Sequence, residues 1–392
     1  MNSVLDRMTP FEAMDVLERS RKLERKGEDV VHLEAGEPDF DVHPLVVKAA
    51  KAAFDEHRTH YTDGFGDLEL REEICRLYRV EHGVEVSPDR VLVSCGSSAA
   101  LMLALQAICD VDDEVLVANP GYPCYRDFVL AAHAKSVEYP VDSANGFQPV
   151  PADIVPLITP RTRAIFVNSP SNPAGTLAAP DVLKALVELF PGDSKHAPVV
   201  LSDEIYDGLV YGGAKARSIL EFTDNAFVFN GFSKRFAMTG LRLGYMIMPK
   251  RFVRPLRILQ QNLFICAGSV AQRAGLEALR LLLGDDADAA AFRRDQAAML
   301  AEYDARRRFM LSRIRDIGME VAAEPHGAFY VFADARRYAA DSSVFAASVL
   351  ERAHVGITPG VDFGSRGQGF LRFSYATSIP RIREAFNRMA EF

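Results

Sequence analysis

The chain has 392 residues, of which 48% are hydrophobic and 25% charged, the usage of an ordinary globular protein. One hydrophobic core seldom serves a chain of this length, so we expect two domains. The net charge of -8 and the pI near 5.7 exclude nucleic acid and anionic membranes as the main partner.

The first thirty residues, "MNSVLDRMTPFEAMDVLERSRKLERKGEDV", predict an amphipathic helix that carries many charges. This segment lacks the continuous apolar region of a signal peptide, and no apolar run in the chain has the length of a membrane span. The five cysteines are scattered without CxxC spacing, which indicates reduced thiols rather than disulfides or a metal site. We therefore expect a cytoplasmic protein without a metal ion.

From about residue 90 to residue 250, apolar strands alternate with helical patterns. The predicted strands are "RVLVSCG", "DEVLVANP", "AKSVEYPVD", "TRAIFVNSP", "APVVLSDEIY", "NAFVFNGFSK" and "LGYMIMP". The predicted helices are "SSAALMLALQAICD", "YPCYRDFVLAAHA", "PADIVPLIT" and "APDVLKALVELF". This alternation predicts an α/β fold with a mostly parallel central sheet flanked by helices, in which ligands bind at the carboxyl ends of the strands.

The pattern changes after about residue 251. A long helix is predicted over residues 289–317, followed by the strands "GAFYVFADA" and "GFLRFSYAT" and a last helix from Ile379. We expect a smaller α+β domain formed from both chain ends. The predicted boundaries are residues 45–280 for the large domain and residues 1–44 with 281–392 for the small domain.

Two of the loops that follow predicted strands carry polar groups suited to an anion and a ring. In Gly96-Ser97-Ser98, a glycine and two hydroxyls precede a helix, an arrangement that binds phosphate but also serves as a plain helix cap. In "VNSPSNPAGT", the amide of Asn172 stands between two prolines, where a simple turn is the alternative.

Two further loops carry charges. "VVLSDEIYDGLV" places Asp203 and Tyr206 at the end of an apolar strand, where a buried carboxylate needs a partner and a plain salt bridge is the alternative. "NGFSKRFAMTGLRLGY" places Lys234 and Arg242 in an unusually apolar segment, although an isolated loop lysine is most often solvated. Together the four loops suit pyridoxal 5'-phosphate held by lysine as an imine, with a stacking ring from "NPGYPCYRDF".

At this point the sequence resembles the class I/II aminotransferases, the fold-type I pyridoxal-phosphate-dependent enzymes. The resemblance covers nearly the whole chain in order, through "LEAGEPDF", "HYTDGFGDLELRE", "NPGYPCY", "NSPSNPAGT", "SDEIYDGL", "NGFSKRFAMTGLRLGY", "PHGAFYVF", "GITPGVDFG" and "LRFSYATS". It implies an aminotransferase of amino-acid metabolism (EC 2.6.1.-). Such an enzyme moves an α-amino group from an amino acid to a 2-oxo acid by a ping-pong mechanism. The family is typically a homodimer with active sites between the subunits.

The resemblance also implies a role for individual residues. Lys234 is the Schiff-base lysine and the general base and acid, and Asp203 is the partner of the pyridine nitrogen. Tyr206 and Asn172 contact the ring's phenolate oxygen, and Tyr122 stacks on the ring. The phosphate site comprises Ser97, Ser98 and Arg242, with Ser233 as a weaker candidate and Tyr61 reaching the phosphate of the neighbouring subunit. The substrate's α-carboxylate is bound by Arg372 and the backbone of Gly36, beside Asn172.

The chain departs from the family's pattern at three places. Leu241 stands where many members have Trp, and Gly231 stands where many have a phosphate-binding serine. The segment Gly96-Ser97-Ser98 lacks the lysine that some aspartate-specific relatives use to bind a distal carboxylate. The missing lysine weakens an aspartate assignment, although another arginine can substitute for it.

Three other functions remain alternatives at this stage. A pyridoxal-phosphate-dependent C–S lyase uses the same residues, because a carbanion can expel a β-substituent instead of taking a proton. A ligand-sensing regulator domain of this fold carries a DNA-binding domain first, for which the residues before Leu33 leave no room. A nicotinamide-dependent dehydrogenase is disfavoured because no G-x-G-x-x-G follows the first strand.

Overall fold

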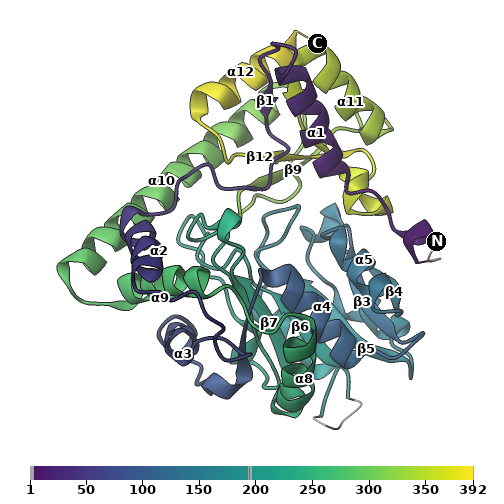
Figure 1. Cartoon of the computed structure of the whole chain (residues 1–392). Coiled ribbons are helices and arrows are strands. Elements are labelled where there is room, and N and C mark those ends of the chain that lie inside the picture. Colours follow the sequence, from purple (N-terminus) through teal and green to yellow (C-terminus); the bar gives the residue numbers. More distant parts are fainter. Residues whose placement is uncertain (1–3, 193, 195–196, 392) are drawn as a thin grey trace.

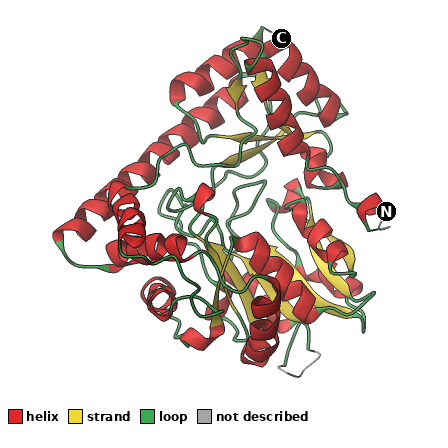
Figure 2. Cartoon of the chain, in the orientation of Figure 1, coloured by secondary structure: helices red, strands yellow, loops and turns green. Residues whose placement is uncertain are grey.

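The computed structural model describes residues 4–192, 194 and 197–391. A seven-stranded sheet forms the lower half of the molecule in Figure 1, and a smaller sheet lies above it (Figure 2). The large sheet has the order β2-β8-β7-β6-β5-β3-β4. Its strands are β2 (Val91–Ser94), β3 (Glu114–Asn119), β4 (Lys135–Pro140), β5 (Thr162–Asn168), β6 (Val199–Asp203), β7 (Ala226–Gly231) and β8 (Gly244–Ile247).

Within this sheet the direction of β8 differs from that of the other strands. It pairs antiparallel with both β2 and β7, whereas the remaining pairs are parallel. The carboxyl ends of the other six strands therefore meet at one edge, together with the first residues of β8. The prediction of a mostly parallel sheet is confirmed, and this edge is where the polar loops gather.

The apolar side chains of the strands point alternately to the two faces of the sheet, so both faces are covered by helices. Val91 and Val93 point to one face and Leu92 to the other. The first face packs against α2 (Pro44–Asp55), α3 (Leu68–His82), α7 (Pro180–Glu188) and α9 (Ser269–Leu283). The second face packs against α4 (Ser97–Ile108), α5 (Cys124–Ala131) and α8 (Val253–Leu263).

One predicted helix is shorter than the sequence pattern indicated. The segment "PADIVPLIT" forms only α6 (Pro151–Ile154), followed by a 3-10 turn at Val155–Leu157. Pro156 lies in that turn. It has no N–H to donate to the hydrogen bonds of an α-helix.

The smaller sheet has the antiparallel order β11-β12-β9, with β11 at Thr358–Pro359, β12 at Phe370–Ser374 and β9 at Tyr330–Asp334. Beside it, β1 (Val31–His32) pairs in parallel with β10 (Val355–Gly356). The helices around these strands are α1 (Glu12–Glu24), α10 (Ala287–Asp316), α11 (Ser342–Ala353) and α12 (Ile379–Ala390). The β1–β10 pair joins the two ends of the chain, as predicted for the small domain.

Helix α10 runs from the large sheet's side of the molecule to the smaller sheet (Figure 1). The exact domain boundaries at residues 45 and 280 stay a prediction. None of the described helices combines the length and apolar character that a bilayer span requires.

Candidate active site

A cavity of about 400 Å³ lies between the carboxyl edge of the large sheet and the smaller sheet. Its wall includes every residue that the sequence predicted for the site except one: Gly36, Ser97, Ser98, Tyr122, Asn172, Asp203, Tyr206, Ser233, Lys234, Arg242 and Arg372. The exception, Tyr61, is 78% exposed in the loop between α2 and α3. The parallel strand direction brings the segments of the large sheet to one place, and Gly36 and Arg372 come from the side of the smaller sheet.

Lys234 follows the end of β7 and is held on both sides by buried side chains. Phe232 and Phe236 belong to the core, and Arg235 forms a bidentate ion pair with Glu81, with N–O distances of 2.7 and 2.8 Å. Burial, helped by the nearby cations Arg372 and Arg242, lowers the pKa of Lys234 to about 8 against the opposing charge of Glu37.

The Nζ atom of Lys234 donates a hydrogen bond to the backbone oxygen of Gly36 at 2.6 Å. This amine therefore lies at the boundary between the two domains, since Gly36 follows β1. An amine with a lowered pKa can accept and return a proton near neutral pH.

Asp203 ends β6 and is only 5% exposed. Its carboxylate accepts hydrogen bonds from the Tyr125 hydroxyl at 2.7 Å and from the Ile205 backbone N–H at 3.1 Å. Burial nevertheless raises the pKa of Asp203, which means that this carboxylate lacks a full cationic partner. A positively charged ring nitrogen would supply that partner.

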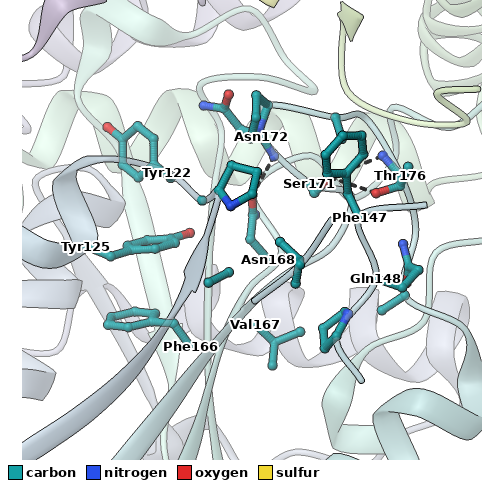
Figure 3. Close-up of a pocket in the computed structure, with 18 of the residues that line it drawn as sticks. Tyr122, Tyr125, Phe147, Gln148, Phe166, Val167, Asn168, Ser171, Asn172 and Thr176 are labelled. Atoms are coloured by element: carbon teal, nitrogen blue, oxygen red, sulfur yellow. Dashed lines mark hydrogen bonds between the residues drawn. The ribbon is translucent and has the colours of Figure 1, made fainter. Parts of the chain in front are cut away.

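The rings of Tyr122 and Tyr125 have different surroundings (Figure 3). The ring of Tyr125 stacks on Phe166 with a centroid distance of 4.3 Å and an interplanar angle of 6°. Tyr122 lines the cavity, with its ring at 87° to that of Phe11. The sequence considered either tyrosine for stacking on a ligand. Both tyrosines line the cavity, and Tyr125 also makes a hydrogen bond to Asp203 that the sequence did not reveal.

Arg372 lies on β12 and is 2% exposed. Its guanidinium donates to Asn172 Oδ1 at 3.0 Å, to the Glu34 backbone oxygen at 2.6 Å and to Thr358 Oγ1 at 3.1 Å. These partners are all neutral, and the Nε atom is buried with no hydrogen-bond partner in the described chain. A buried guanidinium without a carboxylate partner is suited to bind one from a ligand.

The first turn of α4 forms an anion cradle with Arg242. Gly96 has φ +83°, and a Cβ atom there would lie 2.6 Å from Arg242 Nη2. A Cβ atom on Gly244 would lie 2.5 Å from the backbone nitrogen of Ser97. The two glycines therefore allow the guanidinium and the helix N-terminus to approach each other, which concentrates N–H donors and positive charge.

Several cavity residues were missed by the sequence analysis. Tyr330 makes a hydroxyl–hydroxyl contact of 2.8 Å with Tyr206, and its ring lies 4.4 Å from the Arg372 guanidinium carbon. Glu37 accepts a short hydrogen bond from Thr239. Glu37 stands in "LEAGEPDF" beside the predicted Gly36, and Tyr330 stands in "PHGAFYVF". Both segments carry the family resemblance, and this was the signal that could have identified the two residues.

The geometry agrees with comparisons to known proteins. The sequence profile described as "Aminotransferase class I and II" matches residues 28–389. The chain belongs to the class I and II aminotransferases. It is 39% identical over 387 residues to a (5-formylfuran-3-yl)methyl phosphate transaminase of Methanocaldococcus jannaschii, covering 97% of this chain and 96% of the relative.

Other relatives of this aminotransferase carry different substrate names. It is 37% identical over 385 residues to a valine–pyruvate aminotransferase of Mycobacterium tuberculosis, covering 98% of this chain and 96% of the relative. The solved aspartate aminotransferase of Thermus thermophilus with maleate is 35% identical, with a TM-score of 0.92 over 100% of this chain and 99% of that chain. The reaction class is therefore established for this chain as an aminotransferase, whereas the relatives differ in substrate.

Membership of this family implies pyridoxal phosphate as the cofactor, and the residues of the site fit it. The cradle at Gly96, Ser97 and Arg242 matches a phosphate, and the carboxylate of Asp203 matches a protonated ring nitrogen. The amine of Lys234 suits the cofactor's aldehyde, because an amine and an aldehyde form an imine.

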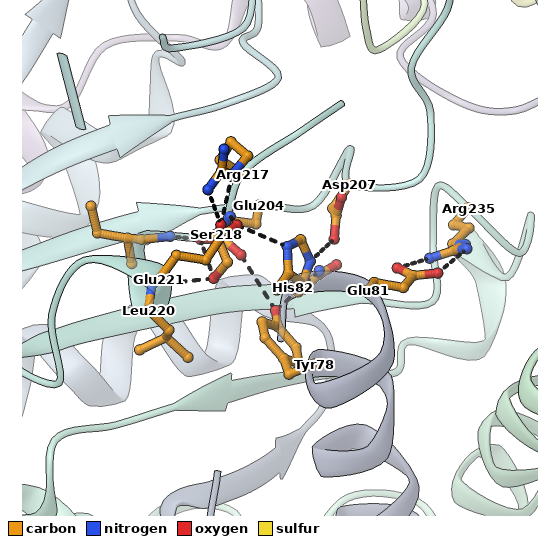
Figure 4. A network of polar contacts seen from close by, with 12 residues as sticks. Tyr78, Glu81, His82, Glu204, Asp207, Arg217, Ser218, Leu220, Glu221 and Arg235 are labelled. Carbon is orange, nitrogen blue, oxygen red and sulfur yellow. Dashed lines mark hydrogen bonds and ion pairs between the residues drawn. The ribbon is translucent and has the colours of Figure 1, made fainter. Parts of the chain in front are cut away.

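A second polar cluster lies behind the cavity of the aminotransferase (Figure 4). His82 contacts Asp207 at 3.0 Å through Nε2 and Glu221 at 3.3 Å through Nδ1. Burial opposes a charge on His82, but the bond to the Asp207 carboxylate and the nearby Glu204 raise its pKa to about 9. Burial raises the pKa of Glu204, next in sequence to Asp203, to about 7.

The side chains Glu81, His82 and Asp207 approach closely enough to hold a metal ion. Both oxygens of Glu81 are already bonded to Arg235, and both ring nitrogens of His82 are bonded to carboxylates. We therefore interpret the cluster as an ion network that supports the ends of β6 and β7.

Proposed function

We propose that this aminotransferase transfers the α-amino group of an amino acid to a 2-oxo acid, with pyridoxal phosphate joined to Lys234. When bound, the cofactor supplies an aldehyde that takes up the amino group and a cationic ring that withdraws electrons from the α-carbon. The observation that carries the proposal is the half-buried Lys234 amine, with its lowered pKa, in one cavity with Asp203 and Arg372.

Each residue of the site has one task in this reaction. Arg372 pairs with the substrate's α-carboxylate, helped by Gly36 and Asn172, and so fixes the α-carbon near Lys234. The Nζ atom of Lys234 removes the α-proton and returns it in the next step, as general base and then general acid. Asp203 remains ionised opposite the ring nitrogen and keeps that nitrogen protonated.

The remaining predicted residues hold the cofactor. Ser97, Ser98 and Arg242 bind its phosphate, with Ser233 close to the same group. Tyr206 and Asn172 donate to the ring's phenolate oxygen, and Tyr122 lies against the ring. Support for these roles comes from their common cavity and from the cradle at the α4 N-terminus.

We further propose that the enzyme is a homodimer in which Tyr61 contributes to the partner's phosphate site. Tyr61 is an exposed aromatic side chain outside the cavity of its own chain, which leaves it available to a neighbouring subunit. The donor and acceptor remain an α-amino acid and a 2-oxo acid of classes to be assigned by assay.

The test of Lys234 is chemical trapping. Borohydride reduction of the holoenzyme, followed by peptide mapping, should attach the cofactor to the peptide that contains Lys234. The Lys234→Ala variant should keep its circular dichroism spectrum and lose amino transfer by a factor of about 10⁴ or more, because both proton transfers lose their group. Unmodified peptide in the wild type, or ordinary transfer rates in the variant, would contradict the assignment.

The same preparation tests the lyase alternative. Cysteine conjugates are incubated with and without 2-oxoglutarate, and pyruvate and ammonia are measured. An aminotransferase forms product only with the 2-oxo acid, whereas a lyase forms pyruvate and ammonia without it.

A further inference from the structure

Tyr330 is the first residue of β9 and is fully buried, yet the proposed function gives it no task. It lines the cavity and contacts both Tyr206 and Arg372. On the neighbouring strand β12, its pairing partner is Ser374, two positions from Arg372. Residues two positions apart on a strand share a face, so Tyr330 and Arg372 are diagonal neighbours on one face of the smaller sheet.

The ring of Tyr330 packs against the guanidinium of Arg372. Its centroid lies 4.4 Å from the guanidinium carbon, and the ring of Phe363 lies 5.1 Å from the same atom. A planar guanidinium is attracted to the faces of aromatic rings, and this attraction is larger where water is excluded. The two rings therefore restrict the direction in which the buried Arg372 can point.

The hydroxyl of Tyr330 joins the smaller sheet to the loop that follows β6. Its oxygen lies 2.8 Å from the Tyr206 oxygen, and the two ring planes meet at 82°. A Cβ atom on Gly36 would lie 2.6 Å from the same hydroxyl oxygen, so the backbone comes this close because residue 36 is glycine. Among the residues that the structure describes, Tyr206 is the hydrogen-bond partner of the Tyr330 hydroxyl.

The two tyrosine hydroxyls have two protons but share one hydrogen bond. Burial raises the pKa of both tyrosines, so both hydroxyls are protonated at neutral pH. One proton lies between the two oxygens, and the other remains for a ligand. If Tyr330 donates, the proton of Tyr206 is free for the cofactor's phenolate oxygen, which is the role proposed above for Tyr206. If Tyr206 donated instead, the phenolate would meet an oxygen without a free proton.

We propose that Tyr330 is a positioning residue for the amino transfer. Its hydroxyl donates to Tyr206 and so directs the Tyr206 proton to the phenolate oxygen of the bound cofactor. Its ring holds Arg372 in place for the substrate's α-carboxylate. One side chain thereby connects the group that binds the cofactor's ring oxygen with the group that binds the substrate. The inference deepens the proposed function and rests on it.

The test of the hydroxyl is the pH dependence of the holoenzyme's visible absorption, which reports the protonation of the nitrogen that joins Lys234 to the cofactor. A hydrogen bond to the neighbouring phenolate weakens the attraction of that oxygen for the proton, so loss of the bond should raise the midpoint pH. In Tyr206→Phe the midpoint should rise by about one pH unit, the effect of one hydrogen bond to a charged group. In Tyr330→Phe it should rise by roughly 0.3 pH unit, because Tyr206 remains but becomes a weaker donor.

The double variant Tyr206→Phe/Tyr330→Phe shows whether Tyr330 acts through Tyr206. Its midpoint should equal that of Tyr206→Phe alone, because a group that acts through Tyr206 has no effect once that hydroxyl is gone. Tyr375→Phe is the matched control. Tyr375 is also fully buried, and its hydroxyl donates to the Ala328 oxygen at 3.2 Å, but it does not line the cavity. Its midpoint should equal that of the wild type.

Equilibrium binding of pyruvate to the holoenzyme tests the ring. Pyruvate is the smallest 2-oxo acid, so its binding depends mainly on its carboxylate. Tyr330→Phe keeps the ring and should bind pyruvate like the wild type, whereas Tyr330→Leu should bind it about tenfold more weakly, the loss expected for a desolvated cation–π contact. Tyr375→Leu removes a buried ring elsewhere in the same domain and should bind pyruvate normally. The hydroxyl test uses only Tyr→Phe changes, so it does not depend on the folding of the Leu variants.

Two failures can be distinguished. If Lys234 is trapped by borohydride but Tyr330→Phe leaves the midpoint unchanged, lowers it or adds its own shift to that of Tyr206→Phe, this inference is wrong and the proposed function stands. Equal binding of pyruvate by Tyr330→Leu and Tyr375→Leu would likewise contradict the role of the ring. If borohydride leaves Lys234 unmodified, the proposed function fails and this inference fails with it.

Discussion

Tyr122 and Tyr125 are three positions apart in the chain and have different surroundings in the site. Both line the cavity, but Tyr122 precedes α5, whereas Tyr125 lies inside α5 and packs on Phe166. The hydroxyl of Tyr125 reaches Asp203 because that ring is immobilised by stacking. A bond to the ionised carboxylate lowers the pKa of Asp203 against the effect of burial.

Tyr125→Phe should therefore lower kcat about tenfold, since Asp203 loses a charge-assisted hydrogen bond and a smaller fraction of it is ionised. The acidic limb of the pH–rate profile should move to higher pH, because the pKa of Asp203 rises further. Kinetics of amino transfer across pH measure both effects.

Tyr139→Phe is the control for this substitution. Its hydroxyl is also buried and donates to the Phe166 backbone oxygen at 2.7 Å, but it does not contact Asp203. Loss of stability without a shifted pH profile is expected there. Identical profiles for Tyr125→Phe and the wild type would show that Tyr125 only fills space.

At the scale of elements, β6 and β7 each end in a segment that we propose to be catalytic, and α3 contacts both. His82 ends α3 and bonds to Asp207, four residues after Asp203, while Glu81 of the same helix holds Arg235 beside Lys234 (Figure 4). These ion pairs are largely buried, so water screens their electrostatic attraction little. One helix end thus aligns two loops that carry different reacting groups.

His82→Gln should destabilise the protein most at low pH. The folded-state pKa of His82 is about 9 against an ordinary 6.5, so its stabilising charge is fully present below pH 6.5 and is lost as pH rises to 9. The difference in unfolding free energy between wild type and variant should be on the order of 3 kcal/mol near pH 6 and should shrink toward pH 9.

Urea unfolding at several pH values measures this difference. His133→Gln serves as the control, because His133 is exposed and should change stability little at any pH. A deficit for His82→Gln that stays constant from pH 6 to pH 9 would mean that His82 is not charged in the folded protein.

At the scale of the whole molecule, the two ends of the chain close over the large sheet. Asp362 near the C-terminal strands caps the first turn of α1 near the N-terminus, and α1 in turn supplies one wall of the cavity. The shape of the cavity therefore depends on contacts between segments about 350 positions apart in sequence.

Asp362→Ala should loosen α1 and raise KM for amino donors several-fold, because the helix loses two hydrogen bonds worth about 1–2 kcal/mol together with a favourable charge at its N-terminus. Hydrogen exchange in residues 12–24 should accelerate in the variant.

Asp341→Ala is the matched control, since Asp341 caps α11 through the N–H groups of Ser343 and Val344 at 2.9 and 3.2 Å. It removes an equivalent cap from a helix that does not line the cavity, so KM should stay unchanged. Equal effects of the two variants on KM would contradict a specific role for the α1 anchor.

The sequence by itself determined the α/β alternation, the central sheet and a group of polar residues on the cavity wall. These features depend on local patterns: apolar runs of strand length, and polar groups placed directly where those runs end, as at Asp203 and Lys234. Parallel strands bring such ends together whatever the details of packing. The break in the predicted helix at residues 151–159 was local too, and Pro156 was its signal.

Only the tertiary structure decided which tyrosine supports Asp203, that Tyr330 lies against Arg372, and that α1 lines the cavity. These relations depend on contacts between segments far apart in the chain, whose relative rotation no local pattern specifies. The same holds for the charge states of Lys234, His82 and Glu204, because burial and neighbouring charges, not residue type, set their pKa values.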